Sequence, residues 1–489
     1  MPPSKYSYLP RPMRLYIAFA TALTCLYSAQ HTLAASPPNW PQFRGAKGAG
    51  LSAEARPPVK IGPEEPVLWR VEVPWSPSSP CIWGERIFLT TFHEGQLEVR
   101  CHDAADGRMR WFRRIRPETV EEHHRSDGSP AASTSATDGQ RLVSYFGSFG
   151  LICHDLNGNE LWRYALPTAE SGGRFGSGGS PIIIGRHTIL NRDQHEYSSL
   201  LAVDLETGRK LWETPRTDAA GSFGSPAHWR NDGEDQVVLA ATARLKGYAL
   251  ATGTERWVID GVTGVVCTTP VVGDDMLYFA AWSPGQPDSP RQPWNEFLKR
   301  YDKNNDGVVD LDEIDLNRRD YLRGMDRNRD GKFTTEDWQL LKDGDARAEN
   351  RLLAVKPGRH GNISDSHVAW QYHRALPYVA SPLIYDGRIY FIKDGGLISS
   401  LDAKTGDVVY TQERIGATGN YYASPVAADG RIYIASLPGK FTVIKAGGTK
   451  PEILHQSDFG TRILATPALA GDRLYLRTAT HLWAFGPEP

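Results

Sequence analysis

The chain has 489 residues, of which 40% are hydrophobic and 23% are charged, and its formal net charge is −2 at pH 7. This near-neutral balance supplies no basic field for a nucleic acid, which argues against that class of partner. Beyond the N-terminal region no segment approaches the roughly 20 apolar residues of a membrane-spanning helix, so no membrane span is predicted.

The N-terminal stretch, residues 1–35, has the pattern of a secretory signal peptide. Basic residues up to Arg14 precede an apolar run from 16 to 27, and the small residues around Leu33-Ala34-Ala35-Ser36 offer a cleavage site. The run is too short to span a bilayer. Cys25 lies in a poor lipoprotein box, so we predict an exported soluble protein, periplasmic or secreted, in preference to a lipid-anchored one.

One short phrase recurs along the rest of the chain and predicts its architecture. Each copy begins with a small hydroxyl residue and proline, and most copies continue through a turn into an alternating strand. Regular copies are 42 to 50 residues apart, which is the spacing of four-stranded propeller blades. Seven copies are clear and the last in this list is degenerate: Ser79-Pro80, Ser180-Pro181, Ser225-Pro226, Thr269-Pro270, Ser381-Pro382, Ser424-Pro425, Thr466-Pro467 and Ser135-Ala136.

Five copies end with a glycine that is followed four residues later by an aromatic residue. The glycine supplies the positive φ of a tight turn, and the aromatic side chain is expected to fill the space between adjacent blades. These tryptophans are therefore interpreted as core and not as a cofactor stack. The pairs are Gly107 with Trp111, Gly158 with Trp162, Gly208 with Trp212, Gly253 with Trp257 and Gly406 with Tyr410.

The two ends of the repeat complement each other. The segment 67–73, which contains Trp69, has no strand before it, whereas the last copy stops after residues 482–485, one strand short. Pairing the two completes an eighth blade and removes the exposed edges of an open array. We therefore predict an all-β fold, an eight-bladed β-propeller whose N-terminal strand closes the last blade, with a small α-helical insert.

The insert is predicted from the one interval that breaks the spacing. From Pro270 to Pro382 the chain runs 112 residues, and the excess contains two calcium-loop patterns in tandem. The predicted organisation is a signal peptide at 1–35, a lead segment at 36–66, blades one to four and the start of blade five at 67–283, the insert at 284–350, and the remaining blades at 351–489.

Both loops have the ligand spacing of an EF-hand, which places oxygen ligands at positions 1, 3, 5, 7, 9 and 12 around a turn that glycine permits. The first loop offers Asp302, Asn304, Asp306, the Val308 carbonyl, Asp310 and Glu313. The second offers Asp326, Asn328, Asp330, the Lys332 carbonyl, Thr334 and Asp337. We expect the second site to be weaker, because Asp337 is shorter than the usual glutamate and Arg327 and Arg329 repel a cation.

The surroundings of the loops fit a paired calcium module. Apolar residues recur at helical spacing in 294–301, 314–325 and 338–341. Between residues 302 and 337 there are eleven acidic and seven basic side chains, a net charge of −4, so without calcium the carboxylates should repel one another. A structural role for calcium and a sensing role both remain open.

Topology predicts where the insert is attached. It leaves after the second strand of blade five and returns at the third, on the same face as the connections between blades. The calcium module is therefore expected over a polar and aromatic rim that either binds a ligand or is ordinary loop surface. The rim segments are 121–124, 174–175, 222–223, 420–422 and 458–462.

The phrase from Ala202 to Trp212 resembles the repeat of the quinoprotein-like, or PQQ-like, propeller family. Residues 401–406 and 103–107 match it in part, and Trp40 to Gly45 resembles an opening segment common in exported bacterial members. The resemblance implies a propeller of PQQ-like repeats. It leaves function open, because the family contains alcohol and sugar dehydrogenases that use pyrroloquinoline quinone (PQQ) as well as non-catalytic members.

Catalytic signatures are missing from the sequence: there is no adjacent cysteine pair, haem-attachment motif or nucleophile elbow. We therefore expect a non-catalytic, calcium-binding interaction protein whose partner is another exported or envelope protein or a polysaccharide. The alternative is a PQQ- and calcium-dependent dehydrogenase of alcohols or sugars, with Asn420, Asp458 and Arg462 near the cofactor. Hydrolase or carbohydrate-binding activity at His123 and His124 rests on less.

Overall fold

The computed structural model describes Met1 and residues 39–487, apart from 125, 172–174, 195–196, 220–221, 286–290, 316–318, 320–325 and 327–329. The predicted signal peptide and most of the predicted helix 314–325 lie outside the described residues. Residues 37–489 form one compact unit. No described helix is both long enough and apolar enough to cross a membrane.

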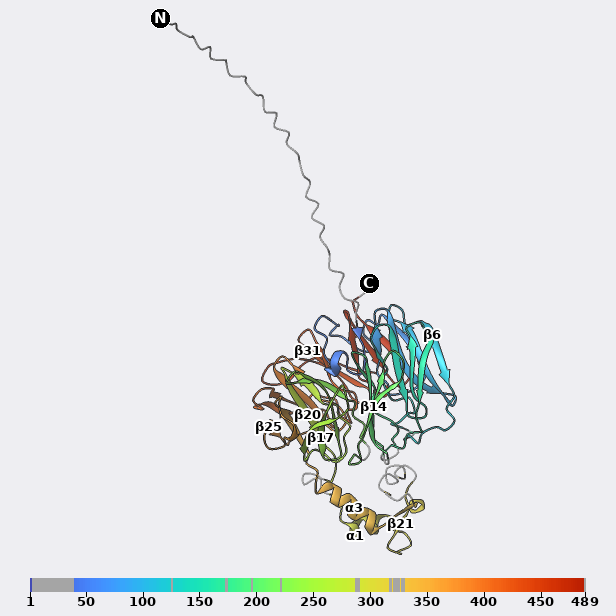
Figure 1. Ribbon diagram of the computed structural model, residues 1–489. Coiled ribbons are helices and arrows are strands. Elements are labelled where there is room, and N and C mark those ends of the chain that lie inside the picture. Colours follow the sequence, from blue (N-terminus) through green and yellow to red (C-terminus); the bar gives the residue numbers. More distant parts are fainter. Residues whose placement is uncertain are drawn as a thin grey trace. The chain divides into compact units, whose positions relative to one another are not determined.

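The unit is an eight-bladed propeller, as predicted (Figure 1). Blade one holds β3 (Cys81–Trp83), β4 (Arg86–His93), β5 (Gln96–Asp103) and β6 (Met109–Ile115); blade two holds β7 (Ala136–Thr137), β8 (Arg141–Phe146), β9 (Gly150–Asp155) and β10 (Glu160–Ala165). Blade three holds β11 (Ile182–Ile184), β12 (His187–Arg192), β13 (Ser199–Asp204) and β14 (Lys210–Pro215); blade four holds β15 (Ala227–Asn231), β16 (Glu234–Ala241), β17 (Arg244–Ala249) and β18 (Glu255–Asp260).

The other four blades follow the same order. Blade five holds β19 (Val271–Gly273), β20 (Met276–Ala281), β23 (Arg351–Val355) and β25 (Val368–Tyr372); blade six holds β26 (Leu383–Tyr385), β27 (Arg388–Lys393), β28 (Leu397–Asp402) and β29 (Val408–Arg414). Blade seven holds β30 (Val426–Ala428), β31 (Arg431–Ala435), β32 (Lys440–Lys445) and β33 (Glu452–Asp458); blade eight holds β34 (Ala468–Ala470), β35 (Arg473–Arg477), β36 (His481–Phe485) and β2 (Trp69–Glu72). Two short strands, β1 (Asn39–Trp40) and β24 (Gly361–Asn362), extend blades one and four.

Burial explains why the strands differ in composition. Inner and middle strands have both faces covered by neighbouring blades, so they are apolar without alternation, as in β30 and β13, where every residue is buried. The outer strand of each blade meets solvent and alternates instead, as in β14. The apolar core is therefore a series of clusters between adjacent blades.

The N-terminal strand closes the ring as the sequence predicts. β2 pairs antiparallel with β36, with Trp69 opposite Ala484 and Glu72 opposite His481. In the lead segment, β1 adds a strand to blade one and the 3-10 helix η1 (Ala46–Gly48) follows it. The ring thus has no open end at the junction of its first and last blades.

The predicted role of the tryptophans between blades is confirmed, and most of them pack on a glycine of the following blade, whereas Trp257 contacts Gly247 of its own blade. The indole Nε1 of Trp212, for example, donates to the carbonyl of Leu250 at 2.9 Å, and its ring lies against Gly253. A Cβ added to that glycine would lie 2.4 Å from the ring. The same arrangement joins Trp69 with Gly107, Trp111 with Gly158, Trp162 with Gly208 and Trp370 with Gly406.

Gly253→Ala is expected to lower the free energy of unfolding by about 2–4 kcal/mol. A residue with a Cβ at φ +69° is strained by about 1–2 kcal/mol, and the clash with Trp212 adds an overpacking cost. Gly387→Ala is the matched control, because Gly387 has the same φ and nothing lies within 4 Å of its added Cβ. Urea unfolding of the two variants separates the clash from the strain; equal losses would contradict the packing argument.

The insert leaves blade five after β20 and returns at β23. Its described elements are α1 (Trp294–Tyr301), β21 (Val309–Asp310), the 3-10 helix η3 (Leu311–Glu313), β22 (Lys332–Phe333) and α3 (Thr335–Asp345), and Figure 1 labels α1 and α3. Its own apolar core is built around Phe297, Phe333 and Trp338. Of the three predicted helical segments, 294–301 corresponds to α1 and 338–341 lies within the longer α3, while most of 314–325 lies outside the described residues.

The base of the insert contacts the connections between blades. The Trp282 N–H donates to the Pro377 carbonyl at 2.9 Å, in the connection between blades five and six. Thr263, in the connection between blades four and five, donates to Ser283 at 2.6 Å and lies 2.9 Å from Asn350 Oδ1. The attachment therefore lies on the predicted face of the ring.

Candidate functional site

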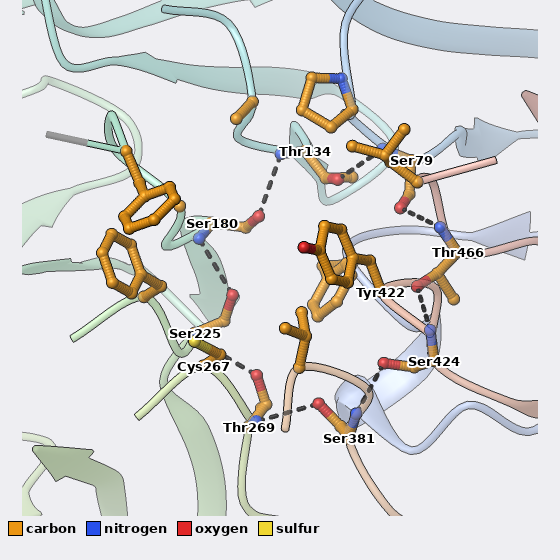
Figure 2. A pocket seen from close by; sticks show the side chains of 18 of the residues that line it. Ser79, Thr134, Ser180, Ser225, Cys267, Thr269, Ser381, Tyr422, Ser424 and Thr466 are labelled. Carbon is orange, nitrogen blue, oxygen red and sulfur yellow. Dashed lines mark hydrogen bonds between the residues drawn. The ribbon is translucent and has the colours of Figure 1, made fainter. Parts of the chain in front are cut away.

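Eight hydroxyl side chains form a closed ring of hydrogen bonds around the centre of the propeller (Figure 2). In each blade the residue before the inner strand donates its backbone N–H to the hydroxyl oxygen of the equivalent residue in the next blade, at 2.9–3.1 Å. The next residue in seven of the eight copies is proline, which has no N–H to leave unpaired. The members are Ser79, Thr134, Ser180, Ser225, Thr269, Ser381, Ser424 and Thr466.

The sequence alignment of the repeats predicted the wrong residue at one position of this ring. The degenerate copy was aligned at Ser135-Ala136, but the hydroxyl in the ring belongs to Thr134, which accepts from Ser79 N at 2.9 Å. Ser135 takes the place of proline and instead lies 2.7 Å from the Ser144 hydroxyl. Without proline to mark the position, two adjacent hydroxyl residues made the register ambiguous by one residue.

The ring surrounds a cavity of about 250 Å³ at the centre of the propeller. All eight ring residues line it, together with small and apolar residues such as Val265 and Leu464. Aromatic side chains from the lead segment and from the connections between blades complete the wall: Phe43, Phe175, Phe223, Tyr378 and Tyr422. In Figure 2 the ring of Tyr422 lies within the circle of hydroxyl groups.

The cavity wall is close to electrically neutral. Among the described residues that line it, Asp127 is the only charged side chain. Arg462 forms an ion pair with Asp127 and also donates to the Ser126 carbonyl at 2.5 Å. The Tyr422 hydroxyl donates to the other carboxylate oxygen at 3.3 Å, and burial together with Asp127 raises the pKa of Tyr422 to about 12. The charge of Asp127 is therefore compensated.

A buried carboxyl group lies behind the cavity wall. Glu121 is 2% exposed, and its Oε2 accepts from the backbone N–H and the hydroxyl of Ser177 at 3.1 and 2.7 Å. Its Oε1 has no hydrogen-bond partner among the residues that the structure describes. Burial raises the pKa of Glu121 to about 8, although Ser177 and the charge of Arg192 act to lower it. Glu121 is therefore mainly protonated at neutral pH.

A buried ion pair supports the neighbouring wall. Arg216 donates to the two oxygens of Asp193 at 2.7 and 3.1 Å, and both side chains are almost completely buried. Ser222 donates to Asp193 at 2.5 Å, and Arg216 also donates to the Tyr248 hydroxyl. Burial alone would lower the pKa of Arg216, but the charge of Asp193 outweighs it and the pKa is raised.

The lead segment takes part in the site, which the sequence did not indicate. Phe43 lines the cavity, and the guanidinium of Arg44, which is completely buried, donates to the Pro382 carbonyl beside the ring residue Ser381. Burial lowers the pKa of Arg44 to about 9, so it stays charged at neutral pH. From the sequence alone, the stretch Trp40 to Gly45 is interpreted only as a segment typical of the family, with no part in a site assigned to it.

Of the predicted rim residues, the structure brings Phe175, Phe223 and Tyr422 to the cavity and places Glu121 behind it. Arg174 lies outside the described residues. Asp458 instead forms an exposed ion pair with Lys440 at 2.7 Å. Stacking of His124 on Phe175, with ring centroids 5.4 Å apart, holds one edge of the rim.

The first predicted calcium loop follows α1. Its carboxylates accept backbone N–H groups: Gly307 N donates to Asp302 Oδ2 at 3.0 Å, and Val308 N donates to Asp306 Oδ1 at 2.9 Å. Glu313 accepts from Lys303, Asn304 and Asp310 at 2.9–3.1 Å. These oxygens thus lie along the inside of a loop of backbone.

The second loop repeats this pattern where it is described. Gly331 N donates to Asp326 Oδ2 at 3.0 Å and Lys332 N to Asp330 Oδ1 at 2.9 Å, and both loop glycines have φ +84°. The loops are joined by pairing of Val309 with Phe333. Thr334 donates to Asp337, whereas Asn328 lies outside the described residues. In the described part of the chain, no three His, Cys, Asp or Glu side chains are gathered closely enough to hold a metal.

Comparison with known proteins agrees with this architecture. The family model described as outer membrane protein assembly factor BamB matches residues 65–228 and 196–487. None of the curated protein sequences compared with the chain matches it.

Solved structures that resemble the chain include three at identities that show the fold alone. BamB from Moraxella catarrhalis has a TM-score of 0.56 at 11% identity, covering 86% of this chain and 99% of that chain. A quinohemoprotein alcohol dehydrogenase from Comamonas testosteroni has a TM-score of 0.53 at 11% identity, covering 92% and 82%. The computationally designed Ika8 protein has a TM-score of 0.52 at 10% identity, covering 86% and 99%. Because the family model spans most of the propeller, the chain belongs to the family described as outer membrane protein assembly factor BamB, with the PQQ-like β-propeller fold.

Proposed function

We propose that this chain is an exported, calcium-binding propeller that binds a partner or ligand at its central cavity without catalysing a reaction on it. The observation that carries this is the chemistry of the cavity wall. Its described residues are hydroxyl, aromatic and aliphatic, and the charge of Asp127 is compensated by Arg462. Such a wall suits binding, and its described residues lack the activated groups that catalysis needs.

The two groups that come nearest to a nucleophile support this view. Burial raises the pKa of the Cys267 thiol to about 12, so almost no thiolate is present at neutral pH. Ser177 donates to Glu121, but a carboxyl group with a pKa of about 8 is already protonated and cannot take the serine proton.

The binding partner in this proposal is another envelope or exported protein, or a polysaccharide. The name of the family supports an envelope protein, since it describes an assembly factor of outer membrane proteins. The N-terminal pattern of residues 1–35 supports export to the periplasm or beyond. Both statements are tested by locating the tagged full chain in fractionated cells of its source and identifying what co-purifies with it after crosslinking.

Calcium is proposed to bind the two loops of the insert. Supporting this, the loops share the same glycine geometry and the same hydrogen bonds from N–H groups to carboxylates, and they pair through β21 and β22. Asp302, Asn304, Asp306, Asp310 and Glu313 supply the hard oxygen ligands that calcium prefers, with the Val308 carbonyl. Bound calcium would compensate the negative charge of the module and order it.

Replacing Asp302 and Glu313 together by alanine is expected to weaken the stronger calcium site at least ~100-fold, because the first ligand and the bidentate ligand are both lost. The measurement is calorimetric titration of chelator-treated protein with calcium. Asp312→Ala is the matched control: this side chain is in the same loop but is 95% exposed and outside the ligand positions. Equal loss in both variants, or none in either, would contradict the assignment.

The PQQ-dependent dehydrogenase is the second candidate, and the described cavity fits it poorly. PQQ carries three carboxylates, whereas the described lining offers no cationic side chain and one carboxylate. Titration with PQQ and calcium, followed by dye reduction with alcohols and aldoses, decides between the candidates. Calcium-dependent PQQ binding with turnover would overturn the non-catalytic assignment.

A further inference from the structure

We propose that the central cavity binds one neutral sugar unit at the end of a saccharide, an inference that rests on the binding role argued above. The first observation is the orientation of the hydroxyl ring. Each ring oxygen already accepts a backbone N–H, and none of the eight hydroxyls donates to an acceptor within the described residues. Every ring residue is at most 4% exposed.

A buried donor without an acceptor costs about 1–3 kcal/mol, so these hydroxyls need water or ligand oxygens. Their backbone partners fix the positions of the oxygens and leave the hydroxyl hydrogens as the free polar groups at the cavity wall. A ligand with many acceptor oxygens satisfies several of them at once. A hydrocarbon ligand would leave them unsatisfied.

The second observation is the aromatic wall. Phe175 and Phe223 meet edge to face with centroids 5.9 Å apart, and both line the cavity with Tyr422. Aromatic faces pack well against the C–H faces of a sugar ring, whose hydroxyl groups lie around its edge. A sugar therefore matches both halves of the wall, apolar on its faces and oxygen-rich on its edge.

Charge and size narrow the class of ligand. A charged sugar would lose hydration in the cavity without a free countercharge among the described lining residues, because Asp127 and Arg462 compensate each other. The volume of about 250 Å³ is slightly below the range of about 300–1,000 Å³ typical of small-molecule sites. That size suits one sugar ring with the rest of the saccharide outside.

The test is calorimetric titration of the calcium-loaded mature protein with maltotetraose, cellotetraose, mannotetraose and chitotetraose, and with tetragalacturonate and cyclohexanol as charged and apolar probes. We expect one or more neutral saccharides to bind with 1:1 stoichiometry and a Kd of about 10 μM to 1 mM. Phe175→Ala and Phe223→Ala should each weaken that binding about tenfold or more. Phe223→Trp should keep it within about threefold.

Phe112→Ala is the matched control, since it makes the same change on the exposed outer strand of blade one, and it should leave affinity unchanged. Circular dichroism of each variant checks that the ring is folded. Absence of binding by every neutral saccharide, binding that ignores Phe175 and Phe223, or tighter binding of tetragalacturonate or cyclohexanol would each overturn the sugar proposal. A purified protein partner or intact calcium binding would then still support the proposed function.

Discussion

Asp193→Ala is expected to lower the free energy of unfolding by about 3–5 kcal/mol, the usual cost of removing one partner of a buried ion pair. Arg216 would keep its charge while losing both of its short contacts to Asp193, and the Tyr248 hydroxyl would remain as its neutral partner. Ser222 would also lose its acceptor. Urea unfolding at pH 7 measures the loss.

The control for this experiment is Asp458→Ala. It removes the same side chain from an ion pair with Lys440, but there both partners are about half exposed, and the expected cost is about 0–1 kcal/mol. The double replacement Asp193→Leu with Arg216→Met should recover most of the lost stability, since no buried charge remains. Similar losses for Asp193→Ala and Asp458→Ala would contradict the role assigned to burial.

Glu121→Gln is expected to change how stability depends on pH. In the wild type the pKa of Glu121 is raised by folding from its ordinary value of about 4.5 to about 8. Its contribution to the free energy of unfolding is therefore complete below pH 4.5. This contribution is lost as pH rises toward 8, because Glu121 releases its proton at a lower pH in the unfolded chain than in the folded protein. The full pKa shift corresponds to roughly 5 kcal/mol of stability. Glutamine at this position still accepts a hydrogen bond from Ser177 and does not titrate, so the variant does not lose this stability as pH rises.

Melting temperatures of the wild type and the variant should therefore diverge between pH 5 and pH 8, with Glu121→Gln the more stable at the alkaline end. Glu122→Gln is the control, because Glu122 is the exposed neighbour of Glu121. The histidines titrate in all three proteins, so their effect cancels when the melting temperatures of the variants and the wild type are subtracted at each pH. Parallel curves for all three proteins would show that Glu121 is ionised in the folded state.

Most of the fold was predictable because every blade has the same structure and therefore needs the same sequence pattern, which recurs along the chain. The eight blades, the closing strand β2 and the tryptophans between blades follow from spacing and from the two incomplete ends. Register was less secure where a copy lacked proline, which is why Thr134 was missed. The existence of an insertion was also predictable, since 112 residues cannot fit one blade interval, whereas its boundaries at 284–350 stay a prediction.

The cavity was only partly predictable. Topology brought Phe175, Phe223 and Tyr422 to the correct face, because they lie in equivalent connections. Phe43 comes from a segment outside the repeat, and Asp127 lies just beyond a predicted rim segment, so neither had a pattern to mark it. In the sequence, the residues of the hydroxyl ring served only to mark the start of each repeat. Their hydrogen bonds to one another could not be predicted, since these bonds run between blades. Calcium binding at both loops stays a prediction.

Closure of the ring has a consequence for how the protein is made. The bond from Thr466 N to Ser79 Oγ and that from Arg477 to Ser78 join residues 387 and 399 positions apart. During synthesis, the side of blade one that contacts blade eight therefore stays without its partner until almost the whole chain has emerged. Contacts of such long sequence separation are formed late and slowly, and unpaired edges aggregate in the meantime. A nascent chain arrested before β36 should for that reason depend on chaperones far more than the completed chain does.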